Sequence, residues 1–276
     1  MRSNLTATWL TLSLLSTACA VKPSVASTPA SPVREHVTSM VLHGKPLELH
    51  LSMPQGPAKG NALILYASGD GGWFGSAVDM FQHIGRAGYY AVGFSSRAFL
   101  KIDRPKGSLV KPGQLISEYR QIVDKARTEL ALGADAPVVL TGWSRGASFA
   151  VMAAAEWRSS WPIQGVIAIG LSDGEDFEVN GAGDETDDGQ PSAAPGHWPF
   201  QPYVQLAQLG SLRCAVIQST GDQYLTAAHA RTLFGSDTPS RRLYTIEARN
   251  HRFSGGEGDF QRGLLDAIGW VTTQQR

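Results

Sequence analysis

A serine between two glycines separates an apolar, strand-like segment from an alanine-rich, helix-like segment. The stretch reads APVVLTGWSRGASFAVMAAAE, residues 136–156, and Ser144 is the serine of its Gly-x-Ser-x-Gly motif. In a strand–turn–helix arrangement, such glycines permit the sharp turn and close packing that expose the serine hydroxyl as a nucleophile. The amino terminus of the following helix also favours negative charge that develops beside the hydroxyl. The spacing therefore predicts nucleophilic acyl-transfer chemistry at Ser144.

The same pattern occurs a second time, at residues 170–174, so the motif alone does not identify the nucleophile. Ser172 follows an apolar run, but the segment after it, EDFEVNGAGDE, is acidic and glycine-rich and lacks the apolar periodicity of a helix. A nucleophile elbow needs that helix. Ser144 is therefore the candidate, and a plain turn without chemistry is the alternative for both serines.

An acid and a histidine each follow a later strand-like run. Asp222 comes two residues after CAVIQST, and His251 comes three residues after RLYTIEA. A serine hydroxyl needs a base to take its proton, and the α/β-hydrolases use a histidine held by a carboxylate, in the chain order Ser, acid, His. We therefore predict a triad of Ser144, Asp222 and His251. Asp173, which follows the preceding strand, remains the alternative acid.

Two backbone N–H groups are expected to bind the oxyanion of the tetrahedral intermediate. One belongs to Arg145, directly after the nucleophile, and the second lies near Asp70 in the loop SGDGGW, residues 68–73. The glycines of this loop allow close approach of its backbone, although an ordinary glycine-rich turn would have the same composition. The loop is not a phosphate-binding P-loop, because no Gly-Lys-Ser/Thr follows it. The predicted chemistry requires no cofactor and no metal ion.

These residues are positioned by an alternation of short apolar strands and longer amphipathic helices. This alternation predicts an α/β-hydrolase fold, with a mostly parallel central sheet and helices on both faces. The 42% of hydrophobic residues in 276 is enough for a large core. The predicted strands are residues 37–44, 46–54, 62–68, 91–96, 137–143, 165–171, 214–220 and 242–248. The predicted helices are residues 76–87, 113–132, 145–157, 224–235 and 258–274.

The ends and one interior stretch depart from this alternation. Residues 1–19 have one basic residue, an apolar run and then small residues, which indicates a signal peptide. Its end fits either a lipoprotein signal, with a lipid anchor on Cys19, or an ordinary cleavage site. Residues 20–35 form a Pro- and Ser-rich linker before a domain at 36–276. Within it, the acidic insertion 171–200 is long enough to be a functional lid or a disordered loop.

Charge and cysteine content exclude several classes of function. The 24 basic and 24 acidic residues balance, so no global field favours nucleic acid. The chain contains two cysteines, Cys19 and Cys214, too few for a disulfide framework or a cysteine-based metal site. Cys214 lies in an apolar strand-like run and is expected to be buried and structural. The expected location is the periplasm or cell envelope.

Four segments together resemble the bacterial virulence-protein VirJ/AcvB family of exported α/β-hydrolases. They are the SGDGGW loop, Trp143 in the elbow, residues 176–179 with the sequence DFEV, and residues 250–253 with the sequence NHRF. The resemblance extends over about residues 60–274. It implies hydrolysis of an aminoacylated lipid, lysyl-phosphatidylglycerol, at the periplasmic face, with Ser144, Asp222 and His251 as the triad.

One residue departs from that family's pattern. Arg145 stands where the family has an apolar residue, and a positive charge facing the pocket would disfavour a lysyl head group. Conversely, no Lys or Arg occurs between Arg158 and Arg213, and the insertion in that span is strongly acidic. Such a cluster either attracts a cationic ester at the rim or is a solvated acidic loop.

The sequence thus predicts an exported serine hydrolase that cleaves an ester, with the lysyl ester of a phospholipid as the substrate that the resemblance implies. A generic carboxylesterase or lipase is the alternative within the same class. A second class also fits the fold, namely an envelope or secretion-system binding protein on a hydrolase scaffold whose triad is idle. The sequence does not determine the oligomeric state.

Overall fold

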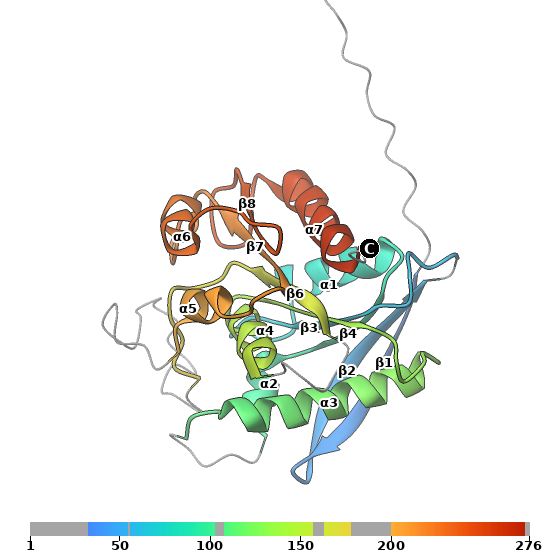
Figure 1. The fold of residues 1–276 in the computed structure, drawn as a ribbon. Helices are drawn as coiled ribbons and strands as arrows, with labels where there is room; N and C mark the ends of the chain where they lie inside the picture. The colour runs from blue at the N-terminus through green and yellow to red at the C-terminus, as the bar shows by residue number, and fades with distance from the viewer. Residues whose placement is uncertain (1–32, 55, 103–107, 157–162, 178–199, 274–276) are drawn as a thin grey trace, which may run out of the picture.

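The computed structural model describes residues 33–54, 56–102, 108–156, 163–177 and 200–273. It has an eight-stranded sheet with the strand order β1-β2-β4-β3-β5-β6-β7-β8 (Figure 1). The pairs β1–β2 and β2–β4 are antiparallel and all others are parallel, so the prediction of a mostly parallel sheet is confirmed. The strands are β1 (Val33–Leu42), β2 (Lys45–Pro54), β3 (Leu63–Ala67), β4 (Tyr90–Phe94), β5 (Val138–Trp143), β6 (Ile163–Ile169), β7 (Arg213–Ser219) and β8 (Arg241–Ile246).

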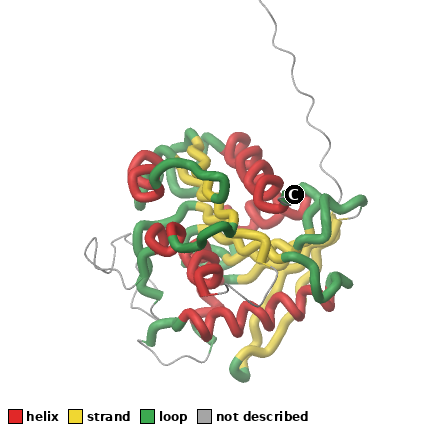
Figure 2. The backbone as a smooth tube through the Cα atoms, viewed as in Figure 1, coloured by secondary structure: helices red, strands yellow, loops and turns green. Residues whose placement is uncertain are grey.

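Helices lie on both faces of this sheet, as Figure 2 shows with helices in red and strands in yellow. The core on one face is built from α1 and α7, and the core on the other from α2, α3, α4, α5 and α6. The central strand β3, with the sequence LILYA, is buried along its whole length, as a strand covered on both faces must be. The helices are α1 (Ser76–Arg86), α2 (Ser96–Leu100), α3 (Pro112–Glu129), α4 (Arg145–Glu156), α5 (Pro202–Ala207), α6 (Ala227–Phe234) and α7 (Glu257–Thr272).

The amino-terminal hairpin has a two-residue turn. His43 and Gly44 both have positive φ, 49° and 78°, and connect the paired residues Leu42 and Lys45. Two consecutive residues with positive φ are typical of the tight turns whose twist matches that of the strands they join. The predicted hairpin is therefore present, and its first strand begins at Val33, three residues before the predicted start of the domain at 36.

Three of the predicted segments lie wholly or mostly outside the described residues. The signal peptide at 1–19 and the linker at 20–35 precede β1 almost entirely, and residues 178–199 of the acidic insertion are also outside. The described ends of the insertion meet in an antiparallel bridge between Glu175 and Phe200, with N···O distances of 3.0 and 3.1 Å. Among the helices of the described part, none is both long and apolar enough to cross a membrane.

Cys214 is expected to be unreactive in the folded protein. Its side chain is fully buried on β7, and burial raises the pKa of the thiol to about 12, so almost no thiolate exists at neutral pH. In a Cys19→Ser variant, Ellman's reagent at pH 8 should detect no thiol in native protein and one equivalent in guanidinium. Rapid reaction of the native protein would contradict the burial of Cys214.

Candidate active site

Ser144 occupies the sharp turn between β5 and α4 and has a left-handed backbone conformation, with φ of 57°. A Cβ atom added to Gly142 would overlap the backbone of Gly146, and one added to Gly146 would overlap the carbonyl oxygen of Ala67. Glycine at both places therefore lets the helix pass directly against the strands. The Ser144 N–H donates to the carbonyl of Ile169 on β6 at 2.8 Å, which fixes the turn. This is the geometry of a nucleophile elbow.

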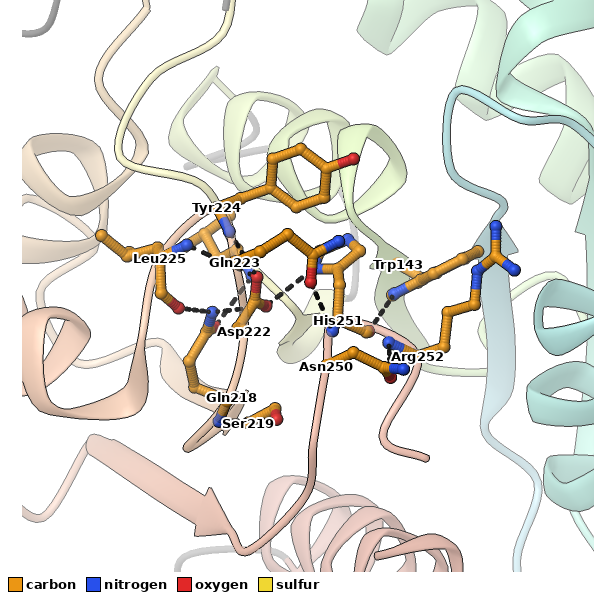
Figure 3. Close-up of polar contacts among 12 residues, drawn as sticks. Trp143, Gln218, Ser219, Asp222, Gln223, Tyr224, Leu225, Asn250, His251 and Arg252 are labelled. Carbon is orange, nitrogen blue, oxygen red and sulfur yellow. Dashed lines mark hydrogen bonds and ion pairs between the residues drawn. The ribbon is translucent and has the colours of Figure 1, made fainter. Parts of the chain in front are cut away.

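Asp222 and His251 form a buried pair at the same edge of the sheet (Figure 3). His251 Nδ1 lies 2.7 Å from Asp222 Oδ2, and the two residues are 7% and 1% exposed. The other carboxylate oxygen, Oδ1, accepts the backbone N–H groups of Tyr224 and Leu225 at 2.9 and 3.4 Å. The loop after β7 thus holds the carboxylate, and the carboxylate holds the imidazole that follows β8.

The imidazole of His251 is also held from the side of the turn at Ser144. The Trp143 ring, next to Ser144 in the chain, stacks on it at 5.3 Å between centroids, and Trp143 Nε1 donates to the His251 carbonyl at 3.2 Å. The backbone N–H of His251 donates to Gln223 Oε1 at 3.1 Å. His251 Nε2 is buried and has no hydrogen-bond partner in the described structure. That nitrogen is therefore the atom left to exchange a proton with a reacting group.

The second Gly-x-Ser-x-Gly motif has a different function in the fold. Gly170 has φ of 57°, and a Cβ atom there would lie 2.7 Å from Cε1 of His251, so this glycine makes room for the imidazole. Ser172 is not among the described residues with positive φ, and its hydroxyl donates to the Gly174 carbonyl at 2.8 Å. Asp222, and not Asp173, bonds to His251. Gly170 of this motif thus packs against the histidine, and Ser172 lacks the backbone geometry of Ser144.

The glycine-rich loop after β3 lies against the elbow. A Cβ atom on Gly69 would lie 3.3 Å from Cβ of Ser144, and the Gly69 carbonyl accepts hydrogen bonds from Ser96 Oγ at 2.7 Å and Gly72 N at 3.1 Å. Because the peptide is trans, the N–H of Asp70 points opposite to that carbonyl. Arg145 begins α4, where the first N–H groups have no acceptor within the helix.

The side chain of Arg145 is engaged by acidic residues. Its Nε lies 3.3 Å from Oε1 of Glu175, a residue that is 9% exposed. Burial lowers the pKa of Arg145, but Glu175, Asp70 and Asp176 together outweigh burial and raise it. Burial raises the pKa of Glu175, Arg145 opposes this effect, and Asp176 and Asp70 reinforce it. Three carboxyl groups, those of Glu175, Asp70 and Asp176, therefore act on the guanidinium of Arg145.

Sequence reasoning missed Gln218 and the spatial function of Gly170. Gln218 is a fully buried polar residue on β7 whose Nε2 lies 3.1 Å from Asp222 Oδ2. Its signal in the sequence is a single amide in the otherwise apolar run CAVIQ, which indicates a buried group that needs partners.

In the described part of the chain, no group of three or more His, Cys, Asp or Glu side chains could hold a metal ion.

The sequence matches no protein-family model and no curated protein, whereas many solved structures share the fold. A dienelactone hydrolase from Anabaena variabilis is 16% identical with a TM-score of 0.57, covering 88% of this chain and 99% of its own. The esterase domain of a Rhodothermus marinus protein is 14% identical, with a TM-score of 0.55 and coverage of 87% and 98%. A Xanthomonas campestris serine hydrolase without a lid is 14% identical, with a TM-score of 0.56 and coverage of 90% and 100%.

These likenesses extend over nearly the whole length of each solved structure. The chain therefore has the α/β-hydrolase fold, as the sequence predicts. At identities this low, the comparison defines the fold and leaves the chemistry to the geometry of the site.

A Gly170→Ala substitution should destabilise the protein more than Gly210→Ala. Both glycines have positive φ, 57° and 65°, but a Cβ atom at Gly210 meets nothing within 4 Å, whereas at Gly170 it meets the His251 ring. Overpacking of this kind costs roughly 1–3 kcal/mol beyond the backbone strain that both variants share. Chemical denaturation measures the difference. Equal losses in the two variants would contradict the tight contact between Gly170 and His251.

Proposed function

We propose that the protein is a serine ester hydrolase that uses Ser144, His251 and Asp222 as a catalytic triad. The observation that supports this most directly is the Asp222–His251 hydrogen bond of 2.7 Å, with Nε2 of the imidazole unpartnered beside the elbow. The fold adds support, because solved structures with similar folds include esterases and a dienelactone hydrolase.

In the proposed reaction, Ser144 Oγ attacks the ester carbonyl while His251 Nε2 takes the hydroxyl proton. Asp222 stabilises the imidazolium through Nδ1, and the proton is then given to the leaving alcohol as the carbon–oxygen bond breaks. A water molecule then attacks the carbonyl of the acyl-enzyme while His251 takes its proton. His251 returns this proton to Ser144 Oγ as the acyl bond breaks, which releases the acid and free Ser144. No other reactant is needed for this cycle.

The proposed oxyanion donors are the N–H groups of Arg145 and Asp70. The first opens a helix directly after the nucleophile, and the second belongs to a peptide whose carbonyl is fixed by Ser96 and Gly72 on the opposite side. Fixing that carbonyl orients the N–H before substrate arrives, so stabilising the oxyanion requires no reorganisation of the loop.

Fluorophosphonate labelling of the purified protein tests the proposed triad without knowledge of the substrate. Wild type and Ser172→Ala should be labelled, and Ser144→Ala should not, because only an activated serine reacts with the probe. The Ser172→Ala variant is the matched control, since it removes the serine of the same five-residue motif. If the folded wild-type protein does not react with the probe, the result would instead support the hypothesis that the protein is a binding protein on a hydrolase scaffold.

For the substrate, we propose an aminoacyl ester of a phospholipid, such as lysyl-phosphatidylglycerol, with a generic carboxylic ester as the alternative. The resemblance to the VirJ/AcvB family supports the lipid ester. The charges beside the elbow support a cationic acyl group, because Arg145 is paired with Glu175 and lies near Asp70 and Asp176. With Arg145 paired, its positive charge is a weaker obstacle to a lysyl group than an unpaired guanidinium would be.

We also propose that the protein is exported and acts at the cell envelope, either anchored through a lipid on Cys19 or free in the periplasm. The support is the composition of residues 1–19 and of the linker that follows. Radiolabelled palmitate incorporation in wild type, and its loss in Cys19→Ser, would identify the lipid anchor.

An Asp70→Asn substitution should reduce hydrolysis of a lysyl ester more than that of a neutral ester of the same alcohol. The asparagine keeps an oxygen for the 2.8 Å hydrogen bond from Gly71 N but removes the negative charge. Because Asp70 is exposed, we expect a selective loss in kcat/KM of roughly two- to fivefold, smaller at high salt. Equal effects on both esters would favour the generic carboxylesterase.

A further inference from the structure

The buried side-chain amide of Gln218 contacts both Asp222, which bonds to His251, and the backbone next to Gly170, which packs against the His251 ring. Gln218 lies on β7, four residues before Asp222, and is fully buried. Its Nε2 donates to Asp222 Oδ2 at 3.1 Å and to the Leu225 carbonyl at 2.6 Å, and its Oε1 accepts from the Leu171 N–H at 3.1 Å. All three contacts belong to the edge of the sheet where the site lies, as the sticks in Figure 3 show for Asp222 and Leu225.

These contacts fix the carboxylate plane. Oδ1 of Asp222 is bound by two backbone N–H groups, and Oδ2 is shared by His251 Nδ1 and Gln218 Nε2. A carboxylate held at both oxygens cannot rotate away from the imidazole without breaking several buried hydrogen bonds, each of which is costly to leave unmade. Gln218 is therefore the side chain that sets which lone pair of Oδ2 remains for His251.

The same amide contacts the segment that backs the imidazole. Leu171, whose N–H it accepts, directly follows Gly170, and Gly170 is in close contact with the ring of His251. Gln218 thus fixes both the carboxylate that bonds to Nδ1 and the backbone that packs against Cε1. The orientation of the amide is determined by its partners, since the reverse orientation would place its oxygen against two acceptors, Asp222 Oδ2 and the Leu225 carbonyl.

We infer that Gln218 is a positioning residue of the active site, which acts through Asp222 to keep Nδ1 of His251 protonated and Nε2 free as the base. The inference rests on the proposed function for its kinetic consequence. An apolar residue of similar size would fill the space on β7, but it would offer neither the donor to Asp222 nor the acceptor to Leu171.

Two substitutions separate positioning from simple packing. Gln218→Met keeps the shape but removes the donor, and with p-nitrophenyl acetate kcat should fall roughly 10- to 100-fold while KM changes less than twofold, since geometry and not binding is impaired. Gln218→Glu restores a donor to Asp222 only when its buried carboxyl is protonated. Burial and the neighbouring Asp222 carboxylate both raise the pKa of the carboxyl that this substitution introduces, so it is protonated at the lower pH values. The kcat of this variant relative to wild type should therefore fall as pH rises from 6 to 9.

The matched control is Gln164→Glu, the same chemical change in a half-buried amide at the start of β6. Gln164 Nε2 donates to the Thr272 carbonyl at 2.7 Å and has no contact with Asp222. Its kcat ratio to wild type should not vary with pH. A folded Gln218→Met with kcat within twofold of wild type, or a Gln218→Glu ratio independent of pH, would overturn the inference.

A readout without substrate keeps the inference separate from the proposed function. The proton shared by His251 Nδ1 and Asp222 should give a far-downfield proton NMR signal in wild type and in Gln164→Glu, and this signal should shift or be lost in Gln218→Met. If wild type neither hydrolyses esters nor reacts with fluorophosphonate, the hydrolase proposal fails, and the signal still tests Gln218. If wild type is active and the signal is unchanged in Gln218→Met, the inference about Gln218 alone fails.

Discussion

The structure depends on the close approach of α4 to the end of β5. With glycine at 142 and 146, the helix backbone comes into direct contact with the strand and with the carbonyl of Ala67. Ser144, between these glycines, has a positive φ that residues other than glycine rarely adopt. The strain is maintained because both flanking elements are buried and cannot relax. The remaining parts of the site, on the loops after β3, β6, β7 and β8, are arranged around this one turn.

Hydrogen bonds across the edge of the sheet hold His251 near the turn at Ser144. Trp143 and Asp222 bond to His251 from the ends of β5 and β7. Gln218 on β7 donates to Asp222 and accepts from Leu171 at the end of β6. Buried networks of this kind are favourable only when every member is satisfied. Here the atom without a partner is Nε2, which is the atom that the proposed chemistry uses.

The sequence predicts this fold well because the relevant signals are local. A fully apolar run such as β3 and a glycine pattern between a strand and a helix are visible within a few residues, and the order Ser144, Asp222, His251 follows from counting strands. The short helix α2 was missed because five residues show no helical period, although Ser95, whose Oγ accepts the Ala98 N–H at 3.1 Å, is a recognisable cap. The pairing of Arg145 with Glu175 joins residues 30 positions apart, and the bond between Gln218 and Leu171 joins residues 47 positions apart. The other bonds of Gln218 depend on how its side chain is oriented. No local pattern in the sequence encodes either.

The bond between Trp143 and His251 has a consequence for synthesis and turnover of the chain. The two residues are separated by 108 positions, and the histidine arrives only with the loop after the last strand. A nascent or proteolytically shortened chain that ends before β8 contains Ser144 but lacks His251, and so has no base to activate the serine. Under the proposed chemistry, activity would therefore report that β8 and the loop after it have docked, whereas the presence of Ser144 alone would not.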